Sequence, residues 1–91
     1  MKSLLSKVEK KLNVSKEKII EYGVKKYLSD ELRNLNIEIL NISNKYGVNS
    51  FEELMDKIEK GEITEEECFN DLTRLEYLEL KKEQIEALLG E

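Results

Sequence analysis

Residues 20–46 read IEYGVKKYLSDELRNLNIEILNISNKY, and this stretch decides the fold. Apolar side chains recur in it about every three to four residues, the period of one face of an α-helix. These positions are Ile20, Val24, Leu28, Leu32, Leu35, Ile39, Ile42 and Tyr46. From Leu28 onward the spacing alternates between four and three, which is the heptad pattern of helices that pack along a seam. The stretch therefore predicts one long helix with an apolar seam.

The ends of this helix carry their own signals. Ser15 is a good N-cap residue, with Glu17 in the first turn behind it, and Gly47 is a common type of helix stop. Ser29, followed by two acidic residues, is also able to cap a new helix. The sequence leaves open whether the long helix is broken near Ser29.

The rest of the chain also has the helical period, and no segment shows the two-residue alternation of a strand. A first helix is predicted over residues 2–12. Ser50 and Thr64 each begin an S/T-x-x-E capping box, which predicts a short helix that stops at Gly61 and a final helix that runs to Gly90. The inner stripe of that last helix is predicted to be Cys68, Leu72, Leu75, Leu78, Ile85 and Leu89.

Composition excludes several classes of function. The 91 residues are 38% charged and 40% apolar, which suits one small helical domain. Histidine is absent, so the commonest general base and transition-metal ligand is missing. The single cysteine, Cys68, allows no intrachain disulfide, and no apolar run approaches the roughly 20 residues that span a bilayer. We expect a soluble, cytoplasmic protein that is not an enzyme and has no metal, cofactor or membrane partner.

Two features resemble catalytic groups but have simpler structural explanations. Glu65, Glu66 and Glu67 form an acidic cluster, yet they occupy the first turn of a predicted helix, where negative charge is favourable. Cys68 follows them at a position that suits a hydrophobic staple with Ile63. Without a histidine to activate its thiol, Cys68 is a poor candidate nucleophile.

Charge is distributed unevenly along the chain. The whole protein has a net charge of −5, but residues 1–27 hold eight lysines against three glutamates, a net charge of +5. Residues 28–91 hold seven basic and seventeen acidic groups, a net charge of −10. This asymmetry suggests that the two halves meet different partners, although solvated helix faces explain such charge runs equally simply.

The basic part combines lysines with aromatic side chains. Tyr22 and Tyr27 lie among four lysines, a combination that is able to grip nucleic acid. The candidate nucleic-acid contacts are Lys16, Lys18, Lys25 and Lys26. The alternative is that Tyr27 belongs to the apolar seam and the lysines only keep it soluble.

The stretch LNVSKEKIIEYGVKKYL, residues 12–28, resembles the second helix of ribbon-helix-helix proteins. The resemblance implies a homodimer in which Gly23 lets two helices cross closely, a reason for a glycine that costs about 1 kcal/mol in a helix interior. The predicted dimer contacts are Ile20, Gly23, Val24, Leu28, Leu32, Leu35 and Ile39. Ribbon-helix-helix proteins read DNA through an N-terminal strand. Here only three residues precede the first apolar helix positions, which is too few to form that strand.

The whole layout is similar to small prokaryotic antitoxins, especially all-helical ones from archaea. KYGVNSFEELMDKIEKGEITEEECFNDLTRLEYLE, residues 45–79, resembles their tail segments in its rhythm of loops and helices. The resemblance implies an acidic tail that wraps a cognate basic toxin of the endoribonuclease type. The candidate toxin contacts are Phe51, Leu54, Phe69, Leu72, Tyr77 and Leu80, although the sequence does not separate anchors from core.

Together these patterns predict an all-α fold of four helices, bundle-like and antiparallel, with one long central helix that dimerises. We expect one domain, residues 1–91, divided into a basic dimerisation unit, residues 1–46, and an acidic helical tail, residues 47–91. The leading functional hypothesis is an antitoxin with an autoregulatory N-terminal unit. The alternatives are a structural homodimer without a nucleic-acid role and a nucleic-acid-binding protein.

Overall fold

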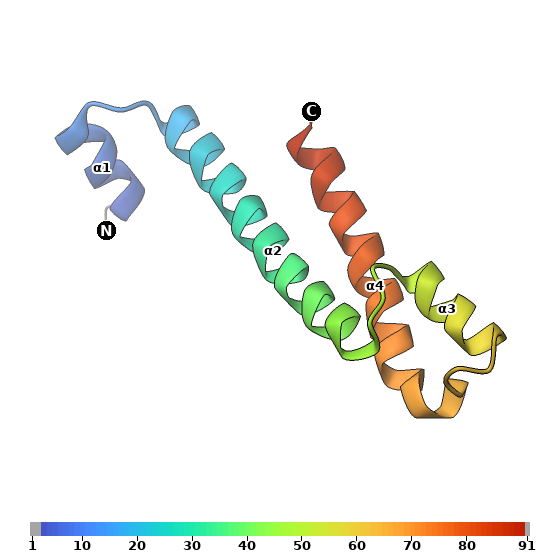
Figure 1. The fold of residues 1–91 in the computed structure, drawn as a ribbon. Coiled ribbons are helices and arrows are strands. Elements are labelled where there is room, and N and C mark those ends of the chain that lie inside the picture. Colours follow the sequence, from blue (N-terminus) through green and yellow to red (C-terminus); the bar gives the residue numbers. More distant parts are fainter. Residues whose placement is uncertain (1–2, 91) are drawn as a thin grey trace.

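The computed structural model describes residues 3–90, which form four helices and no strand (Figure 1). The helices are α1 (Leu4–Leu12), α2 (Lys16–Tyr46), α3 (Phe51–Glu59) and α4 (Glu65–Leu89). The predicted all-α class is confirmed. The first helix was predicted to begin at residue 2, which lies outside the described residues.

Polar caps fix where the helices begin and end. The side chains of Ser15, Ser50 and Thr64 each accept a hydrogen bond from the backbone N–H three residues further on, as the capping patterns predict. α1 ends at Asn13 and α2 at Gly47, which have φ of 53° and 66°. Both lie in the left-handed conformation that asparagine and glycine tolerate best, and this conformation stops a helix.

The long helix α2 passes through Ser29 without a break. Its 31 residues span about 46 Å. The cap that Ser29 offers to a new helix is not used, because the apolar seam continues across it from Val24 to Leu32. The N-terminal part of α2 is therefore a straight continuation of the part that packs on α4.

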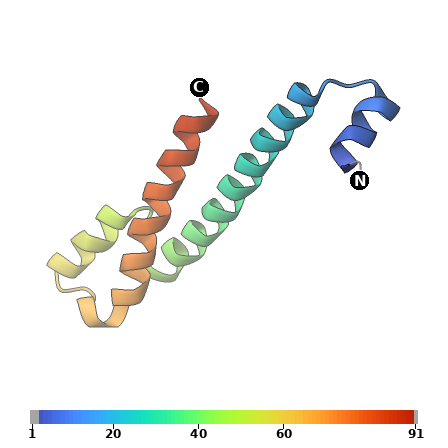
Figure 2. The same cartoon turned by 180° about the vertical axis from the view of Figure 1, so that it is seen from behind.

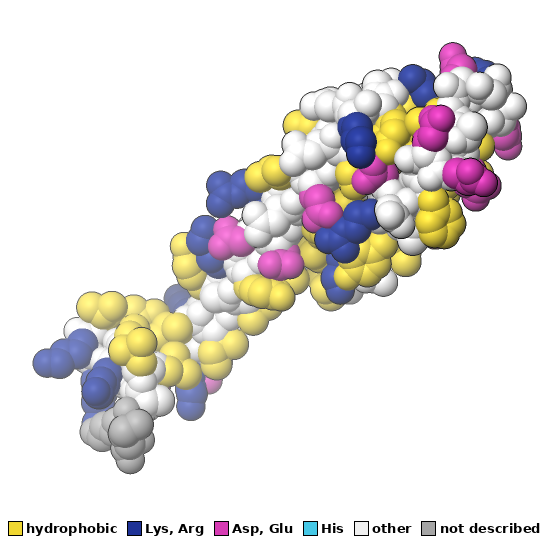
Figure 3. Space-filling model, turned by 90° about the horizontal axis from the view of Figure 1, so that it is seen from below, with side chains coloured by type: hydrophobic (Ala, Val, Ile, Leu, Met, Phe, Trp, Pro, Cys, Tyr) yellow, Lys and Arg dark blue, Asp and Glu magenta, His cyan; other side chains and the backbone are white. Residues whose placement is uncertain are grey.

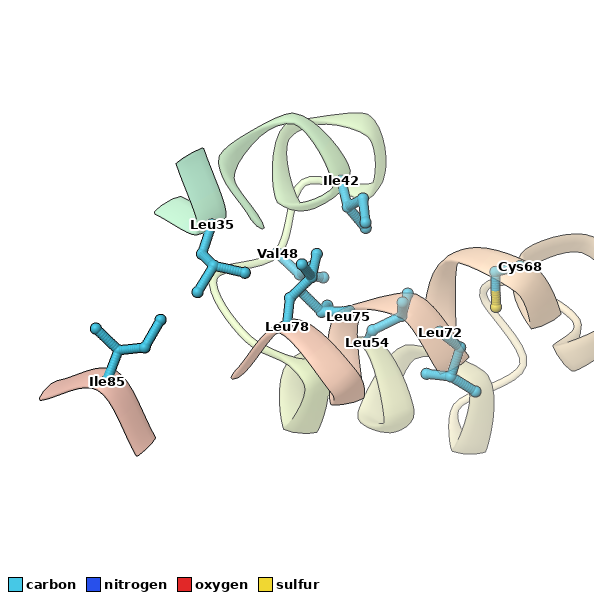
Figure 4. Packing of buried hydrophobic residues seen from close by; sticks show 9 residues of the cluster. All are labelled: Leu35, Ile42, Val48, Leu54, Cys68, Leu72, Leu75, Leu78 and Ile85. Carbon is cyan, nitrogen blue, oxygen red and sulfur yellow. The ribbon is translucent and has the colours of Figure 1, made fainter. Parts of the chain in front are cut away.

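The core lies between the second half of α2, α3 and α4. α4 runs antiparallel to α2 and contacts both α2 and α3 (Figure 1). The buried apolar residues are Leu35, Ile42, Val48, Leu54, Cys68, Leu72, Leu75, Leu78 and Ile85. Figure 4 shows most of them gathered where the three helices meet, with Ile85 further along α4. The predicted inner stripe of α4 is confirmed, since its members are buried or, for Leu89, packed against this core.

The overall shape is extended, and the predicted bundle-like arrangement of all four helices is not confirmed. The radius of gyration is 19.7 Å, whereas a compact domain of this length has about 12 Å. The molecule measures 63 × 26 × 17 Å. The reason is that α2 does not bend, and α4 diverges from it toward the start of α2 (Figures 1 and 2). Among the described residues, only α1 lies beside the start of α2 (Figure 1).

The chain therefore has two parts that differ in packing. The arm, residues 3–27, consists of α1, the turn after it and the first turns of α2, and none of its residues is buried. The three-helix unit, residues 28–90, contains the whole core. The division falls within α2 and not between residues 46 and 47, because the second half of α2 shares its core with α4.

Two leucines of α4 differ in burial, so their replacement by alanine should change the free energy of unfolding by different amounts. Leu75 is fully buried and Leu80 is 55% exposed. We expect Leu75→Ala to lower the free energy of unfolding by about 2–5 kcal/mol, because it leaves a cavity between the helices. Leu80→Ala, the matched control, should change it by less than about 0.5 kcal/mol. Urea denaturation followed by circular dichroism measures both, and equal losses would contradict this core.

Candidate protein-interaction surfaces

The predicted dimer seam is divided between the core and the free surface. Leu35 is buried, and three further members pack partly buried against the same core: Leu28, Leu32 and Ile39. Leu35 is therefore wrong as a free dimer contact, because the chain itself covers it, whereas the other three keep part of their surface exposed and stay predicted dimer contacts. Only the arm positions Ile20, Gly23 and Val24 remain uncovered, because α4 diverges before reaching them.

The candidate toxin contacts are divided in the same way. Leu54 and Leu72 are buried in the core, and Phe51 packs against it. Leu54 and Leu72 are therefore wrong as surface contacts, because no partner reaches them while the chain is folded. Phe69, Tyr77 and Leu80 are 57%, 49% and 55% exposed. They are the members of the predicted set that a partner can touch.

These three residues form an outer stripe on α4, on the side that faces away from the core. Their numbers place Tyr77 about two turns and Leu80 about three turns after Phe69, so all three lie on one broad face of the helix. Glu76 and Glu83 lie one turn before and after Leu80. The outer stripe is thus an exposed apolar strip with carboxylates beside it.

Tyr77 is held in place by its neighbours. The guanidinium of Arg74 lies 5.3 Å from the centre of the Tyr77 ring. Arg74 also donates two hydrogen bonds to the carboxylate of Glu38 on α2, one of them 2.9 Å long. These bonds lower the pKa of Glu38 and fix the guanidinium under the ring. A ring that is already ordered loses less conformational freedom when a partner binds.

A second polar cluster ties the end of α2 to α4. The carboxylate of Asp71 accepts hydrogen bonds from the ammonium of Lys45, at 2.7 Å, and from the hydroxyl of Tyr46. The Lys45 bond is the larger cause of the lowered pKa of Asp71, and the same cluster raises the pKa of Tyr46. Lys57 of α3 donates to the carbonyl oxygen of Tyr46 at 2.8 Å. No local pattern in the sequence predicts this cluster, since Asp71 is 25 and 26 positions away from Tyr46 and Lys45 along the chain.

Another polar contact positions α3. The backbone N–H of Phe51, in the first turn of α3, donates to the Glu79 carboxylate at 2.7 Å. A negative charge at the start of a helix is favourable, because the first N–H groups have no partner within the helix. Glu79 thereby holds α3 against α4.

The candidate nucleic-acid contacts all lie on the arm or at its end, and all are exposed. Two of them have partners on their own helix: Lys25 pairs with Glu21 at 3.2 Å and Lys26 with Asp30 at 3.1 Å. Such exposed pairs stabilise a helix only slightly and break easily. Lys16 and Lys18 lie in the first turn of α2, next to α1.

The sequence did not predict a groove between α1 and the start of α2. It encloses about 640 Å³ and opens to solvent. Its apolar lining comes from Val8, Leu12, Val14, Ile19 and Tyr22. The groove does have a signal in the sequence. Ile19 and Tyr22 lie three residues apart, on the face of α2 opposite the seam, and this spacing indicates a second apolar face there.

Residues 3–90 contain neither a candidate metal-binding cluster nor a membrane-spanning helix. These residues contain no group of three or more histidine, cysteine, aspartate or glutamate side chains placed to hold a metal ion. None of their helices combines the length and apolar character needed to cross a membrane. Cys68 is buried, and its burial raises the pKa of the thiol.

Comparison with known proteins identifies the family of the chain. A family model described as "Uncharacterized protein MJ0235 family" matches residues 1–91. The chain belongs to the MJ0235 family. A relative, Uncharacterized protein MJ0235 of Methanocaldococcus jannaschii, is 43% identical over 75 residues, which cover 82% of this chain and 92% of the relative. No solved structure matches the chain.

The Asp71 cluster predicts a pH-dependent contribution to stability. We expect Asp71→Asn to lower the free energy of unfolding by about 1 kcal/mol near pH 7, a modest value because Lys45 is largely exposed. Since folding lowers the pKa of Asp71, this contribution is present above the ordinary aspartate pKa of about 4 and is lost as pH falls through the lowered value.

Chemical denaturation of both proteins between neutral and acidic pH measures this difference. Tyr46→Phe, which keeps the Lys45 pair, should lose less than Asp71→Asn. Asp56→Asn, the same substitution at an exposed aspartate of α3, controls for the change in charge. A difference between wild type and Asp71→Asn that stays constant down to pH 2 would contradict the assignment.

Proposed function

We propose that this protein is an antitoxin-like binding module, a homodimer that neutralises a small basic toxin of the endoribonuclease type. The outer stripe of α4 carries the proposal. Phe69, Tyr77 and Leu80 are exposed together on a rigid helix and lie beside carboxylates. Large exposed apolar side chains that share one face of a helix are candidate sites of protein contact.

The charge of the three-helix unit supports a basic partner. Residues 28–90 hold seven basic and sixteen acidic groups, a net charge of −9. A toxin that binds RNA has a basic cleft, so this charge steers the two proteins together and speeds their association. The acidic surface then competes with RNA for the same cleft.

The apolar anchors supply most of the affinity in this scheme. Aromatic side chains near the centre of an interface often dominate its binding energy. Tyr77, ordered by Arg74, and Phe69, two turns earlier on the same helix, suit this role. α4 thus acts as an amphipathic helix that lies in an apolar groove of the toxin.

Co-expression tests the proposal directly. The full chain is co-expressed with the product of the neighbouring reading frame, a small basic protein if the proposal is right. We expect the two to co-purify as a stoichiometric complex, and we expect the added chain to suppress RNA cleavage by the purified partner. Absence of a complex, or a partner that does not cleave RNA, would overturn the antitoxin function.

Substitutions locate the contact. We expect Leu80→Ala and Tyr77→Ala each to weaken the complex by about tenfold or more, measured by isothermal titration calorimetry. Leu40→Ala is the matched control for Leu80→Ala, since Leu40 on α2 is 58% exposed and lies outside the stripe. Equal losses for Leu40→Ala and Leu80→Ala would show that the toxin binds elsewhere.

The exposed lysines of the arm support an additional autoregulatory contact with DNA. If Lys16 and Lys18 touch phosphates, binding to a duplex of about 20 base pairs should fall steeply between about 50 and 200 mM salt. Replacing both with glutamine should reduce that slope by about two. Fluorescence anisotropy measures both effects, and no duplex binding at the lower salt concentration would remove this role.

A further inference from the structure

Gly23 lies in the interior of α2, where a glycine makes a helix less stable than alanine does. A Cβ atom built at this position would meet no heavy atom within 4 Å among the described residues. Its φ is not in the left-handed region, so backbone geometry does not require a glycine either. Nothing in the described chain explains the missing side chain. A glycine at an open site fits the close approach of a second backbone.

Large apolar side chains surround this glycine on one face of the arm. Ile20, Val24 and Tyr27 are 50%, 53% and 64% exposed, and they lie within one turn of Gly23. These four residues are the arm face. The arm face continues the apolar seam of the core past Leu28, into the space where α4 has diverged from α2 (Figure 1).

We infer that the arm face binds the arm face of a second copy of this chain, with the two arms crossing antiparallel at Gly23. A two-fold axis through the crossing brings glycine next to glycine and lets the backbones approach closely. Ile20 and Tyr27, one turn before and after the glycine, then pack on either side of the crossing. The same four residues on both copies form the centre of the contact, as the two-fold axis of a closed dimer requires.

Charge complementarity supports a second copy as the partner of the arm. The described arm holds seven lysines against three glutamates, a net charge of +4, whereas the three-helix unit has a net charge of −9. Figure 3 shows the narrow end with apolar patches and basic side chains, and acidic side chains are frequent over the other end. Because α2 is straight, the arm does not fold back onto its own acidic unit.

The antiparallel crossing brings the basic arm of one copy close to the acidic three-helix unit of the other. It directs the basic N-terminal end of each arm toward the second copy's three-helix unit. There α4 ends, with Glu83 and Glu86 in its last two turns. The opposite charges that a straight helix keeps apart within one chain thus meet between two chains.

This inference deepens the homodimer of the proposed function and is tested on the protein alone. Sedimentation equilibrium of the full chain at micromolar concentrations should show a dimer. Val24→Glu should weaken the dimer by about tenfold or more, because it buries a charge in the crossing. Ile37→Glu is the matched control, since Ile37 is also on α2 and also 53% exposed, but lies outside the arm face. It should leave the dimer unchanged.

Gly23→Leu separates dimer loss from misfolding. A single chain has room for the side chain, so at concentrations where wild type and variant are both monomeric the helical content and thermal stability of the variant should be unchanged or higher. Its sedimentation should nevertheless shift to monomer, because the leucine holds the two backbones apart. A Gly23→Leu dimer as tight as wild type would overturn the crossing at this residue.

Other outcomes also decide the matter. A wild-type protein that stays monomeric at all concentrations overturns the inference, and so does equal weakening by Val24→Glu and Ile37→Glu. If the monomer binds a 20-base-pair duplex and Val24→Glu abolishes that binding, the arm face belongs to nucleic acid instead. A dimer without a toxin partner supports the inference even if co-purification fails. A monomer that binds the toxin through the outer stripe overturns the crossing but leaves toxin binding intact.

Discussion

The apolar contact between the second half of α2 and the inner stripe of α4 supports the rest of the molecule. Leu35 and Ile42 on α2 pack with Leu75 and Leu78 on α4, and these residues are almost completely removed from solvent. α3 adds Leu54 to the same core. Because α4 contacts both other helices, its orientation sets which of its side chains face outward. The exposure of the outer stripe therefore follows directly from the burial of the inner one.

The straightness of α2 has equally large consequences. The helix crosses from the core into the arm without a bend. It begins after the N-cap residue Ser15 and continues without a break to the C-cap residue Gly47. A rigid rod with a basic end and an acidic end keeps its own charges apart. Electrostatic attraction between the ends is then available only to other molecules, whether a second copy, a basic protein or a nucleic acid. Because the shape is extended, the uneven charge of the chain acts on its association with other molecules and not on its own folding.

Much of the fold follows from local patterns in the sequence. Capping residues such as Ser15, Ser50 and Thr64 marked the helix starts because their hydrogen bonds involve only neighbours in the chain. Helical periodicity identified the buried face of α4 correctly. Periodicity says which face of a helix is apolar but not which surface covers it. Hence Leu35 and Leu72 were assigned to partners, although the chain covers them itself.

The site was less predictable than the fold, for a related reason. Phe69, Tyr77 and Leu80 lie off the predicted inner stripe of α4, so their exposure has a signal in the helical period. The contacts that order the surface, from Arg74 to Glu38 and from Lys45 to Asp71, join residues more than twenty positions apart. No local pattern encodes such pairs, since they depend on how α2 and α4 are aligned.

The two apolar faces of α4 link the stability of the fold to binding. Arg74, which supports Tyr77 on the outer face, also holds Glu38 across the α2–α4 contact. A protein that binds only the folded outer stripe stabilises the α2–α4 contact by mass action, and so does a second copy that covers the arm face. The core of the three-helix unit is small, and the arm contributes no buried residue to it. Partners therefore add stability to a fold whose own core leaves much apolar surface uncovered. Binding of a protein to the outer stripe and binding of a second copy to the arm face both favour the same alignment of α2 and α4.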